Sequence, residues 1–156
     1  MGDSLSLELE DIINYRAVTE RLWTGGQPTD QQLRMLRQHG VEVVINVAPY
    51  DSRYSIEDEP GLLQSLGVEY HHHPIAFSSP DVSDYLRVED LLDRSMGRKV
   101  FIHCAANYRV SVLVGSYAVN RLGWNTQRRD DLIRGVWSVD EYPVWHELMK
   151  KISREN

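Results

Sequence analysis

The chain has 156 residues, of which 42% are hydrophobic and 26% are charged, and its formal net charge is −6 at pH 7. This length and composition predict one domain, residues 1–156, with enough apolar surface to form its own core. The acidic balance argues against nucleic acid as a partner, because nucleic-acid binding depends on surface cations. No stretch has the length of a membrane span, and the N-terminus lacks the pattern of a signal peptide. With Cys104 as the single cysteine, we expect a cytoplasmic protein without an internal disulfide.

Strand and helix patterns alternate along the chain. The expected strands lie at 22–24, 41–48, 68–75 and 100–103, and the expected helices between 29 and 40, near 61–66, at 81–95, from 110 to 122, from 126 onward and from 143 onward. Thr29 and Gln32 have the spacing of a capping box, and Gly40 follows that helical pattern as a stop signal. Strands separated by helices imply right-handed crossovers. The sequence therefore predicts an α/β fold, with a mostly parallel sheet of about four to five strands and helices on both faces.

The segment around Cys104 carries the strongest functional signal. Cys104 ends an apolar strand, and Arg109 follows it where a helix begins. A helix N-terminus offers unpaired N–H groups and partial positive charge, so it binds phosphate and favours a thiolate over a thiol. A thiolate can attack phosphorus, and a guanidinium can hold two phosphate oxygens. The pattern predicts a cysteine-dependent phosphatase, whereas a cysteine that ends a strand without these neighbours is most often a small buried apolar residue.

The pattern His103-Cys104-x-x-Asn107-x-Arg109-x-Ser111 resembles the phosphate-binding signature of the protein tyrosine and dual-specificity phosphatases, in a form found in a bacterial branch of uncharacterised phosphatase-like proteins. Further matching motifs, which extend the resemblance to about residues 12–150, are Asn14-Tyr15-Arg16-x-Val18-Thr19, Leu22–Thr29 and Val44–Val47. The resemblance implies a phosphotyrosine-phosphatase-like fold. It also implies hydrolysis of a phosphorylated protein or small molecule through a phosphocysteine intermediate on Cys104, with no cofactor.

One departure from the family pattern concerns the arginine. In the family the arginine stands six positions after the cysteine, but here Val110 occupies that position and Arg109 lies one place earlier. Ser111 keeps its family position, so the loop has its usual length. Asn107 stands where the family usually has glycine, and asparagine is among the few residues that tolerate positive φ.

The resemblance and the chemistry together assign roles within the loop. Cys104 is expected to be the nucleophile, and Arg109 is expected to bind phosphate, sulfate or a similar oxyanion. The backbone N–H groups expected to form the anion nest belong to Ala105, Ala106, Asn107, Tyr108, Arg109 and Val110. Ser111 is expected to donate a hydrogen bond to the Cys104 sulfur, and His103 to fix the loop.

The position of the general acid departs from the family as well. The related pattern supplies an aspartate just after the preceding strand, where this chain has Ala76. Asp81 is the nearest candidate for a catalytic acid and Asp84 the next, although both positions are typical of carboxylates that cap a helix. Without an acid, we expect an enzyme that is slow or restricted to good leaving groups such as aryl phosphates.

Other conspicuous residues have structural interpretations. Arg53 lies after a strand end and is expected to be a solvated surface residue rather than a substrate ligand. Residues 71–73 are consecutive histidines of a strand, so they point to alternate faces and cannot converge on one ion. We expect no metal site. Trp124, Trp137, Tyr142 and Trp145 are expected to pack the C-terminal helices onto the core.

Two alternative functions stay open. A rhodanese-like sulfurtransferase would use a persulfide on Cys104, and its active loop commonly has four residues between cysteine and arginine, as here. A non-catalytic phosphate- or phosphopeptide-binding module would explain both Ala76 and the displaced Arg109. The sequence leaves the physiological substrate and the oligomeric state open.

Overall fold

The computed structural model describes residues 8–154, and its centre is a five-stranded sheet with the order β1-β2-β5-β3-β4. The strands are β1 (Arg16–Ala17), β2 (Leu22–Gly25), β3 (Val43–Asn46), β4 (Glu69–His72) and β5 (Val100–His103). Only the β1–β2 pair is antiparallel, so the predicted mostly parallel sheet is confirmed. The predicted strands at 41–48 and 68–75 are shorter in the structure, and the two-residue strand β1 was not predicted from the sequence.

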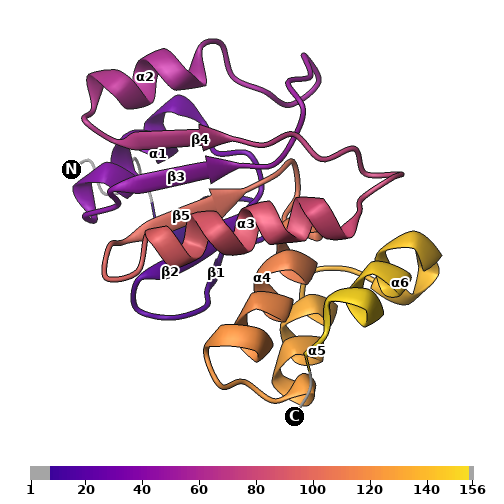
Figure 1. Ribbon diagram of the computed structural model, residues 1–156. Coiled ribbons are helices and arrows are strands. Elements are labelled where there is room, and N and C mark those ends of the chain that lie inside the picture. Colours follow the sequence, from indigo (N-terminus) through magenta and orange to yellow (C-terminus); the bar gives the residue numbers. More distant parts are fainter. Residues whose placement is uncertain (1–7, 155–156) are drawn as a thin grey trace.

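Helices cover both faces of the sheet, as predicted (Figure 1). The helical elements are η2 (Leu9–Asp11), α1 (Asp30–Gln38), α2 (Glu59–Ser65), α3 (Val82–Arg94), α4 (Tyr108–Arg121), α5 (Thr126–Arg134), η3 (Val139–Glu141) and α6 (Pro143–Ile152). The predicted capping box at the start of α1 is present, since Thr29 accepts from the Gln32 N–H while the Gln32 side chain accepts from the Thr29 N–H. Gly40, the predicted stop of this helix, has a φ of +93°.

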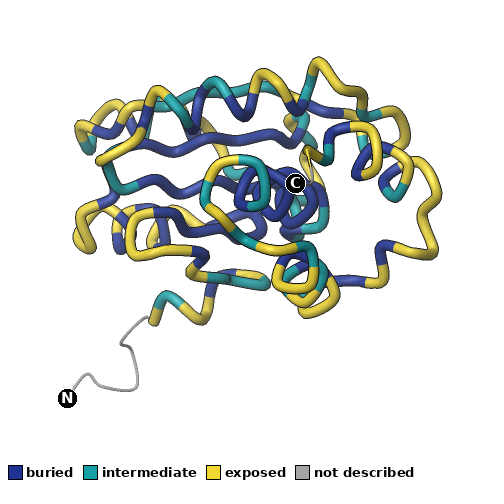
Figure 2. The backbone as a smooth tube through the Cα atoms, turned by 60° about the horizontal axis from the view of Figure 1, so that its bottom comes forward, coloured by how far each residue is buried: buried dark blue, intermediate teal, exposed yellow. Residues whose placement is uncertain are grey.

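Two apolar clusters divide the core between the sheet faces. Ile45 and Ile102 pack with α3, α4, α5 and α6, whereas Val44 and Phe101 pack with α1 and α2. Neighbouring residues of one strand therefore bury their side chains on opposite faces, which explains why β3 is apolar from Val43 to Ile45. Figure 2 shows buried backbone at the centre of the molecule, where β2, β3 and β5 are buried, whereas the edge strands β1 and β4 are half-buried or exposed.

α4 follows the central strand β5 and is the most buried helix: Arg109 and every residue from Val110 to Ala118 are buried. Its apolar side chains contact the sheet on one side and the C-terminal helices on the other. This packing holds the N-terminus of α4 rigidly against the end of β5. Among residues 8–154, no helix is both long and apolar enough to cross a membrane.

Candidate active site

Cys104 lies between the end of β5 and the start of α4, at the edge where β2, β3 and β5 all have their carboxyl ends. Its backbone N–H donates to the carbonyl of Gly25 over 3.4 Å, and its side chain is buried, with 1% of the residue exposed. Ligands of parallel sheets bind at this edge. The structure thus places the cysteine where the sequence predicted it.

The loop after Cys104 turns sharply into α4 at Asn107, which has a φ of +69°. Asn107 therefore adopts the left-handed conformation that asparagine tolerates better than most residues. In the described part of the chain, no acceptor is found for the backbone N–H groups of Ala105, Ala106, Tyr108, Arg109 and Val110. Unbonded N–H groups at the start of a 14-residue helix form a site for an anion.

Two N-terminal motifs hold this loop in shape. Asn107 Nδ2 donates to the Asn14 carbonyl over 2.8 Å and to Thr24 Oγ1 over 3.0 Å, and Asn14 Nδ2 donates to the Ala106 carbonyl over 2.9 Å. The Gly26 backbone passes so close to the loop that an added Cβ would lie 2.5 Å from the Ala105 carbonyl oxygen. The motifs around Asn14 and Gly26 therefore brace the loop, a role that the sequence analysis did not assign to them.

Arg109 points inward, with 7% of the residue exposed. One guanidinium nitrogen, Nη1, donates to the Ile75 carbonyl over 2.8 Å, and the guanidinium carbon lies 5.9 Å from the centre of the Phe77 ring. The Nε atom is buried and has no partner among the described residues. A buried charged donor without an acceptor is unfavourable, so Arg109 retains a free donor for an oxyanion.

His103 is held from behind the loop. The ring is fully buried, with Nδ1 3.1 Å from the Cys104 carbonyl oxygen and Nε2 2.7 Å from Glu59 Oε2. The other carboxylate oxygen, Glu59 Oε1, accepts from Gln27 Nε2 over 2.9 Å. His103 thus fixes the loop, as predicted, while the contribution of Glu59 has no signal in the sequence because a glutamate before Pro60 is typical of an exposed helix start.

Similar solved structures identify this arrangement. A protein from Shewanella putrefaciens CN-32, described as a candidate phosphatase (DUF442), is 28% identical, with a TM-score of 0.84 over 95% of this chain and 96% of its own. TpbA from P. aeruginosa, solved in complex with pTyr, is 18% identical, with a TM-score of 0.73 over 93% of this chain and 86% of its own. The kinase associated phosphatase KAP, solved with its catalytic-site cysteine replaced by serine, is 18% identical, with a TM-score of 0.69 over 86% of this chain and 89% of its own.

The chain has the fold of the protein tyrosine and dual-specificity phosphatases. The predicted resemblance to this group of phosphatases and the predicted fold are both confirmed by these neighbours. No family model and no curated protein matches the sequence.

In this phosphatase fold, Ser111 does not have its predicted contact. Its hydroxyl donates to the Tyr108 carbonyl over 2.7 Å and accepts from Trp137 Nε1 over 3.0 Å. A hydroxyl has one proton to donate, so the predicted hydrogen bond to the Cys104 sulfur is absent from this conformation. Ser111 instead ties the first turn of α4 to the C-terminal aromatic residues.

The first position of the loop before α3 is Ala76, which has no carboxyl group. Its side chain is exposed. Asp81 caps α3, because its side chain accepts a hydrogen bond from the Asp84 N–H. The hydrogen bond from the Ser83 hydroxyl and this backbone hydrogen bond lower the pKa of Asp81. These contacts match the helix-cap interpretation of Asp81, and its role as a catalytic acid stays a prediction.

Asp84 is engaged as well, since Oδ2 completes the capping box and Oδ1 lies 2.9 Å from His73 Nε2. The other two histidines have separate partners: His71 contacts Glu69, and His72 contacts the Ala48 carbonyl. The predicted divergence of the three rings is therefore confirmed. Within residues 8–154, no group of three or more potential metal ligands gathers.

Arg53 does not reach the loop, because it forms a bidentate pair with Asp51 on the surface and its side chain is 84% exposed. The hydrogen bond from Arg53 lowers the pKa of Asp51 to about 2. The interpretation of Arg53 as a surface residue is confirmed by this exposure.

An aromatic cluster stands beside the loop. Tyr108 stacks on Trp137 at 4.8 Å, and Phe77 contacts both Trp137 and Tyr142. Trp145 is fully buried in the same cluster and donates to the Phe77 carbonyl over 2.7 Å. The predicted packing role is confirmed for Trp137 and Trp145, and Trp124 packs partly buried against the core, whereas Tyr142 contacts the cluster but is 42% exposed.

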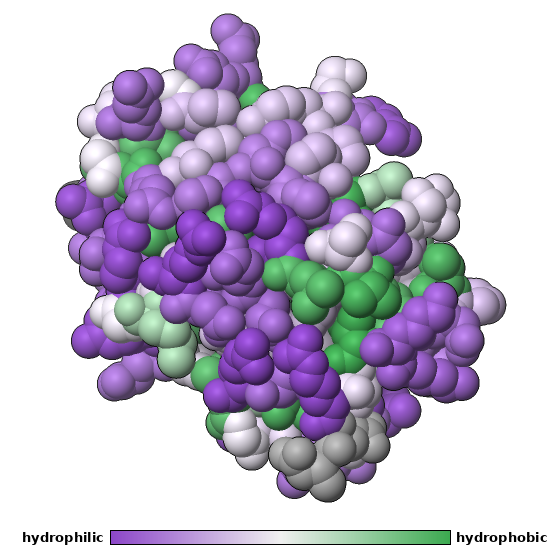
Figure 3. Space-filling model, in the orientation of Figure 1, coloured by the Kyte–Doolittle hydropathy of each residue, from purple (hydrophilic) through white to green (hydrophobic). Residues whose placement is uncertain are grey.

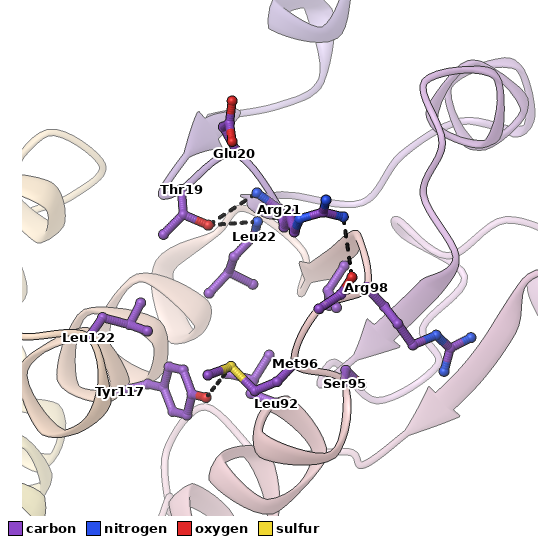
Figure 4. Close-up of a pocket in the computed structure, with 12 residues that line it drawn as sticks. Thr19, Glu20, Arg21, Leu22, Leu92, Ser95, Met96, Arg98, Tyr117 and Leu122 are labelled. Carbon is purple, nitrogen blue, oxygen red and sulfur yellow. Dashed lines mark hydrogen bonds between the residues drawn. The ribbon is translucent and has the colours of Figure 1, made fainter.

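Four cavities among the described residues lie outside the loop, and two of these four are larger than the others. One, of about 370 Å³, lies at the opposite end of β2 and β5, between Leu22, Met96 and Tyr117 (Figure 4). The other, of about 410 Å³, lies between Val82 of α3 and Val144 of α6, where Figure 3 shows apolar surface among hydrophilic residues. Neither is lined by a residue of the Cys104 loop, so neither contributes to the candidate site.

Proposed function

We propose that this protein is a phosphoester hydrolase that acts through a phosphocysteine intermediate on Cys104. The observation that supports it most is the buried Arg109 guanidinium in the first turn of α4, whose Nε has no partner among the described residues, in the same segment as Cys104 and the unbonded backbone N–H groups. The 28% identical Shewanella protein, described as a candidate phosphatase and matched over nearly its whole length, supports the same activity.

In the proposed reaction, the Cys104 thiolate attacks phosphorus, a sulfur–phosphorus bond forms, and the bond to the leaving oxygen breaks. The N–H groups of the loop and the Arg109 guanidinium bind the three peripheral phosphate oxygens. Water then attacks the phosphocysteine, which releases inorganic phosphate and restores the thiolate.

The leaving group takes its proton from water in this mechanism, because Ala76 supplies no carboxyl group and Asp81 is an ionised helix cap. General acid catalysis contributes roughly 10²–10⁴-fold, so we propose a weak enzyme that prefers aryl phosphates, whose leaving groups need little protonation. A thiolate nucleophile must stay reduced, which fits a cytoplasmic bacterial protein.

The test is turnover of an aryl phosphate by the wild type and by Cys104→Ser. We expect the substitution to lower turnover by roughly 10³-fold or more, while vanadate or phosphate still binds. Arg53→Lys, a surface substitution, serves as the control for handling and folding. Equal turnover in wild type and Cys104→Ser would refute the proposal, and oxyanion binding without any turnover in the wild type would support a non-catalytic binding module instead.

A rhodanese-like sulfurtransferase is the second candidate, because four residues separate Cys104 from Arg109 and sulfur transfer to cyanide needs no carboxylic acid. In that reaction thiosulfate gives its outer sulfur to the thiolate and sulfite leaves, after which cyanide takes the sulfur as thiocyanate. Thiocyanate formation, together with a mass increase of one sulfur atom on Cys104, would favour this function.

A further inference from the structure

A buried carboxylate is linked to the nucleophile through His103. Glu59, the first residue of α2, is 2% exposed and lies at hydrogen-bond distance from His103 Nε2 on one side and from Gln27 Nε2 on the other. His103 Nδ1 continues this chain to the Cys104 carbonyl oxygen. Four residues from α2, the loop after β2 and the end of β5 therefore form one buried polar network directly behind the loop.

The contacts of the His103 ring determine its proton count. Both ring nitrogens face oxygen atoms, a carboxylate at 2.7 Å and a backbone carbonyl at 3.1 Å, and neither oxygen has a proton to give when Glu59 is ionised. A neutral imidazole has one N–H, so it would leave one of these two acceptors facing a bare nitrogen. Only the imidazolium form satisfies both contacts.

The contacts of Glu59 in this network favour its ionised form. Burial by itself raises the pKa of Glu59, but the charge and hydrogen bond of His103 and the hydrogen bond from Gln27 outweigh burial, so the pKa of Glu59 is lowered. A buried carboxylate without a cation is strongly unfavourable, which makes the His103 charge necessary to Glu59 as well.

The other groups around this pair do not replace His103. From β4, His72 adds a weaker attraction to Glu59, but its Nε2 contacts the Ala48 carbonyl instead of the carboxylate. Burial raises the pKa of Tyr70, also on β4, so its hydroxyl stays neutral. From β5, Phe101 stacks on the His103 ring at 5.9 Å and carries no charge.

We propose that Glu59 is a positioning residue: it keeps His103 as an imidazolium, which fixes the direction of the Cys104 carbonyl and stabilises the Cys104 thiolate. The inference rests on the proposed function only in taking the thiolate as the reactive form. Its physical basis is that His103 Nδ1 contacts the Cys104 carbonyl in a water-excluded site, where a positive charge favours a negative charge on the same residue.

The test uses the fact that Cys104 is the only cysteine in the chain. Alkylation by iodoacetamide follows the thiolate fraction, so its rate across pH gives a midpoint for this residue without any phosphatase assay. We expect Glu59→Gln to move the midpoint upward by about one pH unit and to slow alkylation roughly tenfold below it. Glu59→Asp retains the charge and is expected to restore most of the rate.

Glu69→Gln is the matched control, because it removes a carboxylate that also contacts a histidine, His71, but on the exposed end of β4. We expect no change in the alkylation midpoint for this variant. In a His103→Asn background, Glu59→Gln should have no further effect if Glu59 acts through His103. An unchanged midpoint in folded Glu59→Gln, or an equal shift in the control, would overturn the proposal.

If Glu59→Gln does not fold, ¹⁵N NMR of histidine-labelled wild type still decides the point. We expect both ring nitrogens of His103 to be protonated at pH 7, and a neutral ring would overturn the proposal. Alkylation requires no turnover, so the two proposals can fail separately. If Glu59→Gln shifts the alkylation midpoint but the wild type hydrolyses no phosphoester, the role of Glu59 is supported and the hydrolase function is refuted.

Discussion

Arg109→Lys tests whether Arg109, which stands one position earlier than the arginine of the family signature, binds the oxyanion. The guanidinium has one donor committed to the Ile75 carbonyl and a buried Nε without a partner among the described residues. Lysine keeps the positive charge but has a single nitrogen, which cannot reach both the Ile75 carbonyl and an oxyanion with the geometry of the guanidinium fork. We therefore expect oxyanion binding to lose one charge-assisted hydrogen bond.

Such a bond contributes about 1.5–3 kcal/mol, which corresponds to a roughly 10- to 150-fold weaker Kd. The assay is urea unfolding with and without phosphate or vanadate. At a ligand concentration of 100 times the wild-type Kd, the wild type should gain about 2.7 kcal/mol in free energy of unfolding. A variant with roughly 30-fold weaker binding should gain about 0.9 kcal/mol under the same conditions.

Arg53→Lys is the control, because this surface arginine pairs with Asp51 and should leave the ligand effect unchanged. If Arg109→Lys gains as much stability from the oxyanion as the wild type does, Arg109 is a structural residue that only holds the Ile75 carbonyl. The displaced arginine would then lose its part in the proposed reaction.

Two further predictions concern the missing acid and the shape of the loop. Asp81→Asn should lower thermal stability but leave the turnover of an aryl phosphate and its pH profile unchanged; a fall in turnover across pH 5–8 would show that Asp81 is catalytic. Ala76→Asp should raise the turnover of alkyl phosphates and add a basic limb to the pH profile. Asn107→Ala should lower the free energy of unfolding by about 2–4 kcal/mol, because it removes the buried hydrogen bonds to Asn14 and Thr24 and puts a Cβ-bearing residue without a local hydrogen bond at positive φ. Urea unfolding measures this loss, and a change below about 1 kcal/mol would contradict the bracing role of Asn107.

The sequence predicts the class of fold because its signals are local. Hydrophobic runs such as 41–48 and capping residues such as Thr29 act over a few residues, and alternation of strands and helices leaves few topologies. The strand lengths were less accurate: β3 and β4 end at Asn46 and His72, although single backbone hydrogen bonds continue beyond them from the Val47 and His73 N–H groups. The two-residue strand β1 has no local signal and exists because β2 pairs with it.

The loop from Cys104 to Ser111 could be located from the sequence for the same reason. A strand, a cysteine, an asparagine that accepts positive φ and a helix follow one another directly, so the chain order itself builds the anion nest. The direction of Arg109 could not be predicted, because it depends on the Ile75 carbonyl from a segment 34 residues earlier.

What the sequence by itself determined is thus the α/β fold, the position of Cys104 at a strand end and the left-handed turn at Asn107. Only the tertiary structure decided that Arg109 donates to the Ile75 carbonyl, that Ser111 donates to Tyr108, and that Glu59 contacts His103 inside the core. The physical reason is that propensity and capping are properties of neighbouring residues, whereas the proton and hydrogen-bond partners of a buried polar group depend on segments that meet only when the chain is folded.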